Sequence, residues 1–318
     1  VAPLIEQECG IPVIGYLPAD ERFSLESRHL GLVTAAEVDD LRAKMELVAD
    51  ALLEHVDFDA LRALASSAPR ICAAPFSVEP VCAPDEAPVV AVAYDKAFCF
   101  YYEENFRLLE QLGARIERFS PLTDAAVPDD ADAIYLGGGY PELYAGLLAD
   151  NAPMRDSIAR ACAAGMPVFA ECGGFLYLQR SLADLEGTAH PMAGVLPAQA
   201  AYTGHLTRFG YVTLTAQEDN LLMERGETVP AHEFHYYDSD GNGDACIASK
   251  PHSQRSWPCF VAQGNTLAGF PHLYFPAKPD IARRFVEAAR AFQATRTDAM
   301  RTTGETRSSR GRNDVHDR

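Results

Sequence analysis

The hydrophobic pattern between residues 89 and 182 alternates short apolar runs with amphipathic segments. Three apolar runs are typical of buried strands, namely residues 89–93, 133–136 and 167–170, and residues 115–119 continue the alternation as a further strand. Two segments carry apolar residues at helical spacing and end at a glycine, namely residues 104–112 and 153–164. This alternation predicts an α/β domain with a mostly parallel sheet and helices on both faces. Ligands of such a sheet bind at the carboxyl ends of its strands.

The pattern changes after residue 182. Three segments predict antiparallel strands, namely residues 208–214, 232–237 and 246–248. Residues 267–275 predict a strand that ends in a loop, and residues 279–292 predict a closing helix with Pro279 in its first turn. Residues 296–318 contain almost nothing apolar, so we expect a disordered tail there.

The N-terminal part has a separate organisation. Residues 10–18 form an apolar run bounded by glycine and proline, which predicts a buried parallel strand. Residues 26–33 predict a loop, and residues 35–53 predict a helix with one apolar face. Residues 66–88 are rich in alanine and proline without periodicity, which predicts a semi-rigid linker. The expected domains are therefore residues 1–65 and 89–295.

Composition narrows the class of protein. The chain has 318 residues, of which 48% are hydrophobic, enough for one large or two ordinary domains. No apolar run approaches the ~20 residues that span a bilayer, and no leader pattern opens the sequence. The net charge of −18 disfavours nucleic acid and anionic membranes as partners. The eight cysteines form no C-x-x-C pair, which argues against a zinc knuckle and a disulfide framework and favours a reducing cytoplasm.

Cys172 lies between the apolar run 167–170 and a helical segment, so the local order is strand, tight turn, helix. That order is typical of a nucleophile elbow, which needs small residues two positions away on each side, here Ala170 and Gly174. A helix N-terminus stabilises an anion and so favours the reactive thiolate. We predict that Cys172 is a catalytic nucleophile; the alternative is a buried cysteine that packs as a small hydrophobe.

A cysteine nucleophile requires a base, and His272 is the candidate among nine histidines. It follows an apolar strand at the point where the chain leaves the sheet for the edge where the elbow opens. Three glycines follow the strand 133–136, and an N–H of Gly138 or Gly139, with that of Gly173, would form an oxyanion hole. The alternative for His272 is a histidine of the core or the surface without a catalytic role. The alternative for the three glycines is a turn that binds nothing.

Two stretches that suggest metal sites do not fit one. Residues 238–244, Asp-Ser-Asp-Gly-Asn-Gly-Asp, match the first half of a calcium loop, but Ser249 stands where the bidentate glutamate belongs. Residues 232–235, His-Glu-Phe-His, have one residue too few between the histidines for a zinc helix. We predict no metal site, and we expect Glu233 or His235 at the wall of a substrate site.

Five stretches together resemble the glutamine amidotransferase half of the cobyrinate a,c-diamide synthase family. They are residues 91–105 (AVAYDKAFCFYYEEN), 119–122 (FSPL), 136–142 (LGGGYPE), 170–174 (AECGG) and 232–235 (HEFH). Residues 10–33, with RHLGL at 28–32, resemble the end of the dethiobiotin-synthetase-like ATP domain of that family. The resemblance covers nearly all of residues 10–292.

The resemblance implies a class I glutamine amidotransferase-like fold over residues 89–295, preceded at 1–65 by the end of a P-loop amidoligase domain. It implies that Cys172 attacks the side-chain amide of L-glutamine and that His272 serves as base and acid. The released ammonia would amidate the a and c carboxylates of cobyrinic acid in cobalamin biosynthesis, with ATP and Mg²⁺ required by the complete enzyme and no cofactor bound by the amidotransferase domain itself.

Further residues in the matching stretches are expected near ligands. Tyr140 and Glu142 are expected at the substrate site, and Arg28 and His29 at the nucleotide or at the domain interface. A homodimer is compatible with the resemblance, and no membrane or nucleic-acid partner is implied.

The sequence departs from the wider amidotransferase pattern at two points. Tyr274 stands two residues after His272, where most class I enzymes carry an orienting carboxylate; the corrinoid amidotransferases share this departure, and the orienting partner stays unidentified. No G-x-x-x-x-G-K-[ST] motif occurs, so the chain would supply the glutaminase half beside an incomplete ATP half. The alternatives are a synthase acting on nickel sirohydrochlorin or another tetrapyrrole, and a truncated, non-catalytic binding partner.

Overall fold

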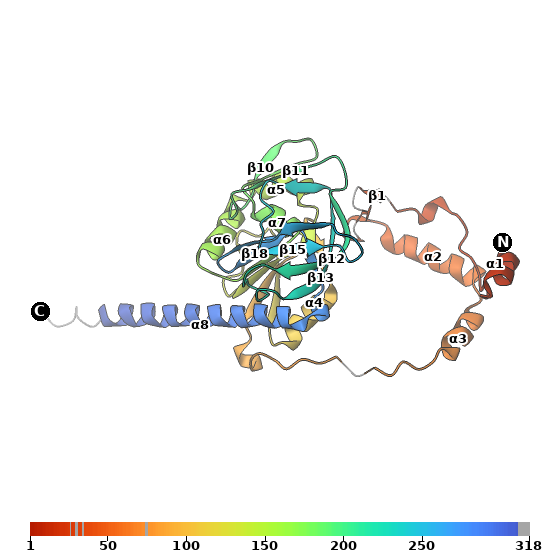
Figure 1. The fold of residues 1–318 in the computed structure, drawn as a ribbon, viewed down its shortest axis with the longest axis horizontal. Coiled ribbons are helices and arrows are strands. Elements are labelled where there is room, and N and C mark those ends of the chain that lie inside the picture. The colour runs from red at the N-terminus through yellow and green to blue at the C-terminus, as the bar shows by residue number, and fades with distance from the viewer. Residues whose placement is uncertain (26, 29–30, 34, 74–75, 311–318) are drawn as a thin grey trace, which may run out of the picture. The chain divides into compact units, whose positions relative to one another are not determined.

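A computed structural model of the chain describes residues 1–25, 27–28, 31–33, 35–73 and 76–310 (Figure 1). The chain divides into two compact units, Val1–Phe76 and Ser77–Arg318. The division falls inside the predicted linker. From Ser77 onward the chain belongs to the second unit, because Val78 and Val81 pack against its core and the N–H of Val81 donates to the carbonyl of Leu112 at 2.8 Å.

The second unit is built on a six-stranded sheet with the order β17-β18-β8-β6-β3-β5. Its strands are β3 (Val89–Ala93), β5 (Arg115–Phe119), β6 (Ala133–Leu136), β8 (Val168–Glu171), β17 (Val261–Gln263) and β18 (Thr266–Gly269). The neighbouring pairs from β18 to β5 are parallel, and β17 pairs antiparallel with β18. The predicted mostly parallel sheet is therefore confirmed.

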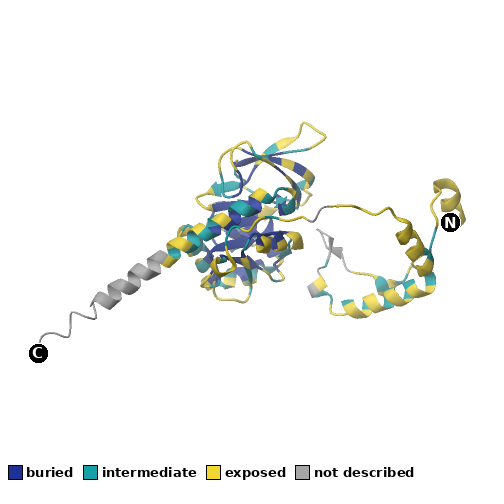
Figure 2. Cartoon of the chain, turned by 90° about the horizontal axis from the view of Figure 1, so that it is seen from below, coloured by how far each residue is buried: buried dark blue, intermediate teal, exposed yellow. Residues whose placement is uncertain are grey.

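Helices cover both faces of this sheet because alternate residues of each buried strand point to opposite sides. Val90 and Val92 share a core with α4 (Glu103–Gln111) and α8 (Pro279–Arg310). Ala91 and Ala93 share the other core, which includes residues of the remaining helices of this unit. Those helices are α5 (Ala145–Asp150), α6 (Ala152–Ala163) and α7 (Gly173–Leu178). Figure 2 shows the buried strands between these layers.

A five-stranded antiparallel sheet, of order β16-β15-β12-β13-β19, packs on the core of α4 and α8. Its strands are β12 (Arg208–Ala216), β13 (Thr228–His235), β15 (Cys246–Ser249), β16 (Ser256–Cys259) and β19 (His272–Leu273). Leu214, Val229 and Leu273 are its inward residues and are fully buried. The antiparallel strands predicted at residues 208–214 and 246–248 are confirmed as β12 and β15. The strand predicted at residues 232–237 ends with β13 at His235, and β19 pairs with β13.

Several short elements were not predicted. They are β4 (Phe98–Phe100) paired with β7 (Gly138–Gly139), the sheet β10 (Ala189–Pro191), β9 (Ser181–Ala183), β11 (Gln199–Tyr202) and β14 (Tyr237–Ser239), and the 3₁₀ turns η3 (Pro84–Glu86), η4 (Pro141–Tyr144) and η5 (Phe275–Ala277). Their two to four residues are too few for a periodic pattern to stand out.

The first unit differs most from prediction. Its elements are α1 (Ala2–Cys9), η1 (Glu21–Phe23), β1 (Ser27–Arg28), β2 (Gly31–Leu32), η2 (Ala35–Glu37), α2 (Leu41–His55) and α3 (Phe58–Ser67). The buried strand predicted at residues 10–18 is wrong: Ile11 is 60% exposed, and Gly15 makes a single bridge to Val56. A buried strand needs neighbours on both sides, and the described part of this unit pairs only β1 with β2.

Three boundaries also differ. The loop expected at 26–33 contains the pair β1 and β2, and α2 begins at Leu41 because Asp39 and Asp40 favour positions before a helix rather than inside it. Helix α8 runs to Arg310, through residues expected to be disordered; this stretch contains no proline, which would break a helix. Residues 311–318 lie outside the described residues.

Among the described helices, none combines the length and the apolar character that crossing a membrane requires.

Candidate active site

Cys172 occupies a strained turn between β8 and α7. Its φ of 49° and ψ of −103° lie outside the regions that non-glycine residues normally adopt. The neighbouring strands hold it there, because its N–H donates to the carbonyl of Gly269 at 2.8 Å and the N–H of Gly174 donates to that of Gly137 at 2.8 Å. A Cβ on Gly174 would lie 2.2 Å from the carbonyl oxygen of Leu136, so only glycine fits. The predicted strand, tight turn and helix around Cys172 are therefore present, and its role as nucleophile stays a prediction.

His272 faces this elbow. It begins β19, opposite His232 of β13, and its side chain is 14% exposed. Burial alone would lower the pKa of His272, but its hydrogen bond with Cys172 and the neighbouring charges of Cys172 and Glu171 outweigh burial and raise that pKa to about 10. The surroundings of His272 therefore favour the protonated imidazole. The structure brings together the two residues that the sequence predicts as nucleophile and base.

Glu171 is a residue of this site that the sequence analysis missed. Its Oε1 lies 3.4 Å from Nδ1 of His272, and its side chain is fully buried. It directly precedes Cys172 inside a quoted motif, but an apolar run that ends in one glutamate does not reveal where that side chain points. The only signal was a charged residue at the end of an otherwise buried strand.

The glycines after β6 lie beside the elbow. A Cβ added to Gly173 would lie 3.0 Å from the amide nitrogen of Gly139, so these two residues are in contact. The N–H of Gly137 is engaged, since it donates to the hydroxyl of Tyr101 at 2.9 Å. Gly173 is the first residue of α7, where an N–H has no partner within the helix. The amides of Gly139 and Gly173 therefore lie close together beside the elbow, and their role as an oxyanion hole stays a prediction.

Tyr140 and Glu142 follow this turn and are almost fully buried, at 1% and 3% exposure. The ring of Tyr140 packs edge to face against Phe100, with centroids 5.0 Å apart. Glu142 belongs to η4. Contact of either side chain with substrate stays a prediction.

Glu233 and His235 point into a separate small cavity of about 20 Å³. Its lining includes Arg208 and Trp257, but neither Cys172 nor His272. Burial raises the pKa of Glu233 and lowers that of His235 to about 4. Oε2 of Glu233 and Nε2 of His235 have no hydrogen-bond partner. Contact of Glu233 or His235 with substrate therefore stays a prediction.

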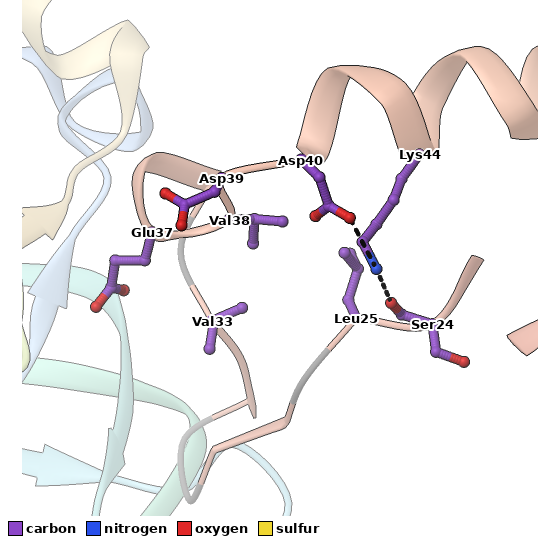
Figure 3. Close-up of a pocket in the computed structure, with 8 residues that line it drawn as sticks. All are labelled: Ser24, Leu25, Val33, Glu37, Val38, Asp39, Asp40 and Lys44. Carbon is purple, nitrogen blue, oxygen red and sulfur yellow. Dashed lines mark hydrogen bonds and ion pairs between the residues drawn. The ribbon is translucent and has the colours of Figure 1, made fainter. Parts of the chain in front are cut away.

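The first unit contains a larger cavity of about 420 Å³ (Figure 3). Three of its lining residues are acidic, namely Glu37, Asp39 and Asp40. Its lysine, Lys44, already donates to the carbonyl of Ser24 at 3.0 Å and lies 3.7 Å from Asp40. An acidic lining with an engaged cation does not suit a triphosphate.

The other nucleotide expectations have no support in the described residues. The backbone of Arg28 lies in β1, and His29 lies outside the described residues. No group of three or more histidine, cysteine, aspartate or glutamate side chains in the described part of the chain could hold a metal ion. Binding of ATP and Mg²⁺ therefore stays a prediction for the complete enzyme.

Comparison with known proteins places the site in a family. Residues 89–280 match the CobB/CobQ-like glutamine amidotransferase domain. Three relatives named cobyrinate a,c-diamide synthase come from Caldanaerobacter subterraneus subsp. tengcongensis, Listeria monocytogenes serotype 4b and Salmonella typhimurium, with 36%, 38% and 39% identity. The matches cover 91%, 85% and 90% of this chain but only 64%, 60% and 63% of those relatives. The chain thus spans less than two thirds of their length.

Proposed function

The chain belongs to the CobB/CobQ-like glutamine amidotransferase family, and we propose that it hydrolyses L-glutamine through Cys172 and His272 to supply ammonia for an amidation. The observation that carries the proposal is the hydrogen-bonded pair of a cysteine on a strained elbow and a buried histidine of raised pKa. Such a pair is the arrangement of an activated thiol nucleophile.

The first half of the reaction forms a thioester. The sulfur of Cys172, as thiolate, attacks the side-chain carbonyl carbon of glutamine. The carbonyl oxygen gains the negative charge and accepts hydrogen bonds from the amides of Gly139 and Gly173. Gly138 packs against the imidazole ring of His272. His272 donates its proton to the amide nitrogen, the carbon–nitrogen bond breaks and ammonia leaves.

The second half restores the enzyme. Water attacks the thioester carbonyl carbon while His272, now neutral, accepts a proton from that water. The carbon–sulfur bond breaks, glutamate leaves, and Cys172 is again a thiolate beside a cationic His272. One water molecule is consumed for each ammonia and glutamate released.

The names of the relatives support a proposal for the molecule that accepts the nitrogen. We propose that the ammonia amidates the a and c carboxylates of cobyrinic acid, because the relatives at 36–39% identity are named cobyrinate a,c-diamide synthase. We propose that ATP and Mg²⁺ drive this amidation in the complete enzyme, as the resemblance to the synthase family implies. We further propose that the enzyme is cytoplasmic and homodimeric, with substrate contacts from Tyr140, Glu142, Glu233 or His235.

Glutamine hydrolysis by the 318-residue chain tests the proposal. Glutamate production is measured for the wild type, for Cys172→Ser and for the control Cys72→Ser, whose cysteine is exposed. We expect Cys172→Ser to lose activity by at least ~10⁴-fold and Cys72→Ser to retain it. A wild type that shows no hydrolysis, even with an ATP-domain protein added, would favour a non-catalytic binding partner and reject the glutaminase.

A further inference from the structure

A histidine that transfers protons needs its second ring nitrogen held, because that contact sets the tautomer and the orientation of the ring. Tyr274, two residues after His272, cannot supply a carboxylate, and its ring packs edge to face against Tyr102 with centroids 5.2 Å apart. Nδ1 of His272 lies 3.4 Å from Oε1 of Glu171 instead. Glu171, which ends β8, is therefore a candidate for the orienting carboxylate that position 274 lacks.

We propose that Glu171 is the positioning carboxylate for His272, a role that rests on the proposed glutaminase function. Glu171 ends β8, so one dipeptide supplies both the nucleophile and the group that orients its base. Its Oε2 accepts a hydrogen bond from the N–H of Leu273 at 3.2 Å. The carboxylate thus holds the ring of His272 with one oxygen and the backbone of β19 with the other.

A buried polar network fixes Glu171 in turn. The hydroxyl of Tyr135 lies 3.0 Å from Oε1 of Glu171, and Nδ2 of Asn105 lies 3.4 Å from that hydroxyl. Because an amide NH₂ can only donate, the hydroxyl proton of Tyr135 is left to point at the carboxylate. Every contact to Glu171 is then a donor, as an acceptor-only carboxylate requires.

Asn105 also holds the segment that carries the histidine. Its Nδ2 donates to the carbonyl of Leu273 at 2.8 Å, and its Oδ1 accepts from the N–H of Phe275 at 2.8 Å. Asn105, Tyr135 and Glu171 are each fully buried. A satisfied buried network of this kind restricts its members to one arrangement. The backbone that directly follows His272 is therefore held by Asn105 and Glu171.

A purely structural role would leave part of this geometry unexplained. One carboxylate oxygen is enough to accept from the N–H of Leu273, and a glutamine at position 171 could do so equally well. The second oxygen is turned toward His272, where the negative charge itself matters, because it stabilises the imidazolium. Charge and hydrogen bonding can therefore be separated by substitution.

The first test compares Glu171→Gln, Glu171→Asp and Tyr135→Phe in the full chain. We expect Glu171→Gln to lower kcat for glutamine hydrolysis by ~10²–10⁴-fold with KM nearly unchanged, because the carboxylate orients the histidine without touching substrate. Glu171→Asp keeps the charge and should recover part of the loss. Tyr135→Phe removes one hydrogen bond to Glu171 but keeps the carboxylate, so we expect a loss under ~10-fold.

The pH profile separates positioning from simple destabilisation. The other titratable groups that influence or face His272 are Cys172, His232, Glu233 and His235, with Lys250 near His232. Glu171→Gln leaves all of them in place. We expect the alkaline limb of kcat/KM for glutamine hydrolysis to move to lower pH in this variant. The imidazolium then lacks one neighbouring negative charge.

A further measurement needs no substitution at position 171. Nitrogen-15 NMR of the wild-type histidines, with the His272 signals assigned through His272→Gln, reports which ring nitrogen carries a proton above the pKa of the ring. We expect Nδ1 of His272 to stay protonated toward Glu171. Protonation at Nε2 only, or a Glu171→Gln variant with wild-type kcat and an unmoved pH profile, would overturn the proposal. If the wild type hydrolyses glutamine in that case, the proposed function stands and only the role of Glu171 falls.

Discussion

Gly138 lies directly against the ring of His272: a Cβ built on Gly138 would be 2.5 Å from Cε1 of the imidazole. The backbone of Gly138 is held by β4, where it stands opposite Phe100. The imidazole therefore lies against both the glycine turn and Glu171. The glycine is needed there for space around the base, in addition to any role of its N–H.

Gly138→Ala should displace the imidazole and lower glutamine hydrolysis by ~10²-fold, since a misplacement of about 1 Å has that effect on aligned groups. The control is Gly146→Ala, because a Cβ on Gly146 meets nothing closer than 3.7 Å and the residue lies in helix α5. We expect this control to keep full activity. Equal activity of the two variants would show that the ring does not depend on the space at Gly138.

The strained backbone at Cys172 predicts that this residue lowers the folding stability of the protein. Its φ of 49° disfavours any side chain, and glycine adopts this region readily. Cys172→Gly and Cys172→Ala both remove the sulfur, so their difference isolates the backbone. We expect Cys172→Gly to be more stable than Cys172→Ala by about 1 kcal/mol in chemical denaturation, although glycine usually destabilises. An alanine variant that is equally or more stable would contradict strain at the elbow.

The raised pKa of His272 predicts a loss of stability at alkaline pH. The folded-state pKa of about 10 exceeds the unfolded value of 6.5, so the protonated ring stabilises the fold fully below pH 6.5. That contribution is lost as the pH rises through about 10. We expect the free energy of unfolding to fall between pH 7 and 10 more steeply for the wild type than for His272→Gln. Parallel curves for the two proteins would exclude the cationic histidine.

The sequence predicted which residue types form the site better than it predicted how those residues contact one another. Cys172 was predicted because a strand, a turn and a helix follow one another in the chain, and such local order is visible as periodicity. Glu171, Tyr135 and Asn105 escaped prediction because their contacts join β8, β6 and α4, and no pattern within one segment shows which way a buried polar side chain points.

In the first unit, the sequence pattern predicted an element that the structure does not contain. The apolar run at residues 10–18 has the composition of a buried strand, but burial depends on neighbours that periodicity does not contain. Among the described residues of that unit, no strand flanks the run, and Leu17 is 47% exposed. A correct pattern therefore gave a wrong element, because sheet formation is a property of several segments together.

The last prediction concerns the end of α8, where a disordered tail was expected. Arg296 lies 2.8 Å from Oδ1 of Asp132, whose side chain is fully buried and whose Oδ2 accepts from the N–H of Val89 at 2.9 Å. Removing the cation leaves a buried carboxylate without its partner. We expect Arg296→Ala to lower the free energy of unfolding by about 2–4 kcal/mol.

Arg290→Ala is the matched control on the same helix. Arg290 pairs with Glu86, but the two side chains are 42% and 55% exposed, so we expect a loss under about 1 kcal/mol. Both free energies come from urea denaturation of the full chain at pH 7. A disordered segment makes no persistent contact with the buried carboxylate, so an Arg296→Ala variant as stable as the wild type would mean that α8 ends before this residue. A large loss confined to Arg296→Ala means instead that the helix fastens the start of β3 and the turn before β6 to one another.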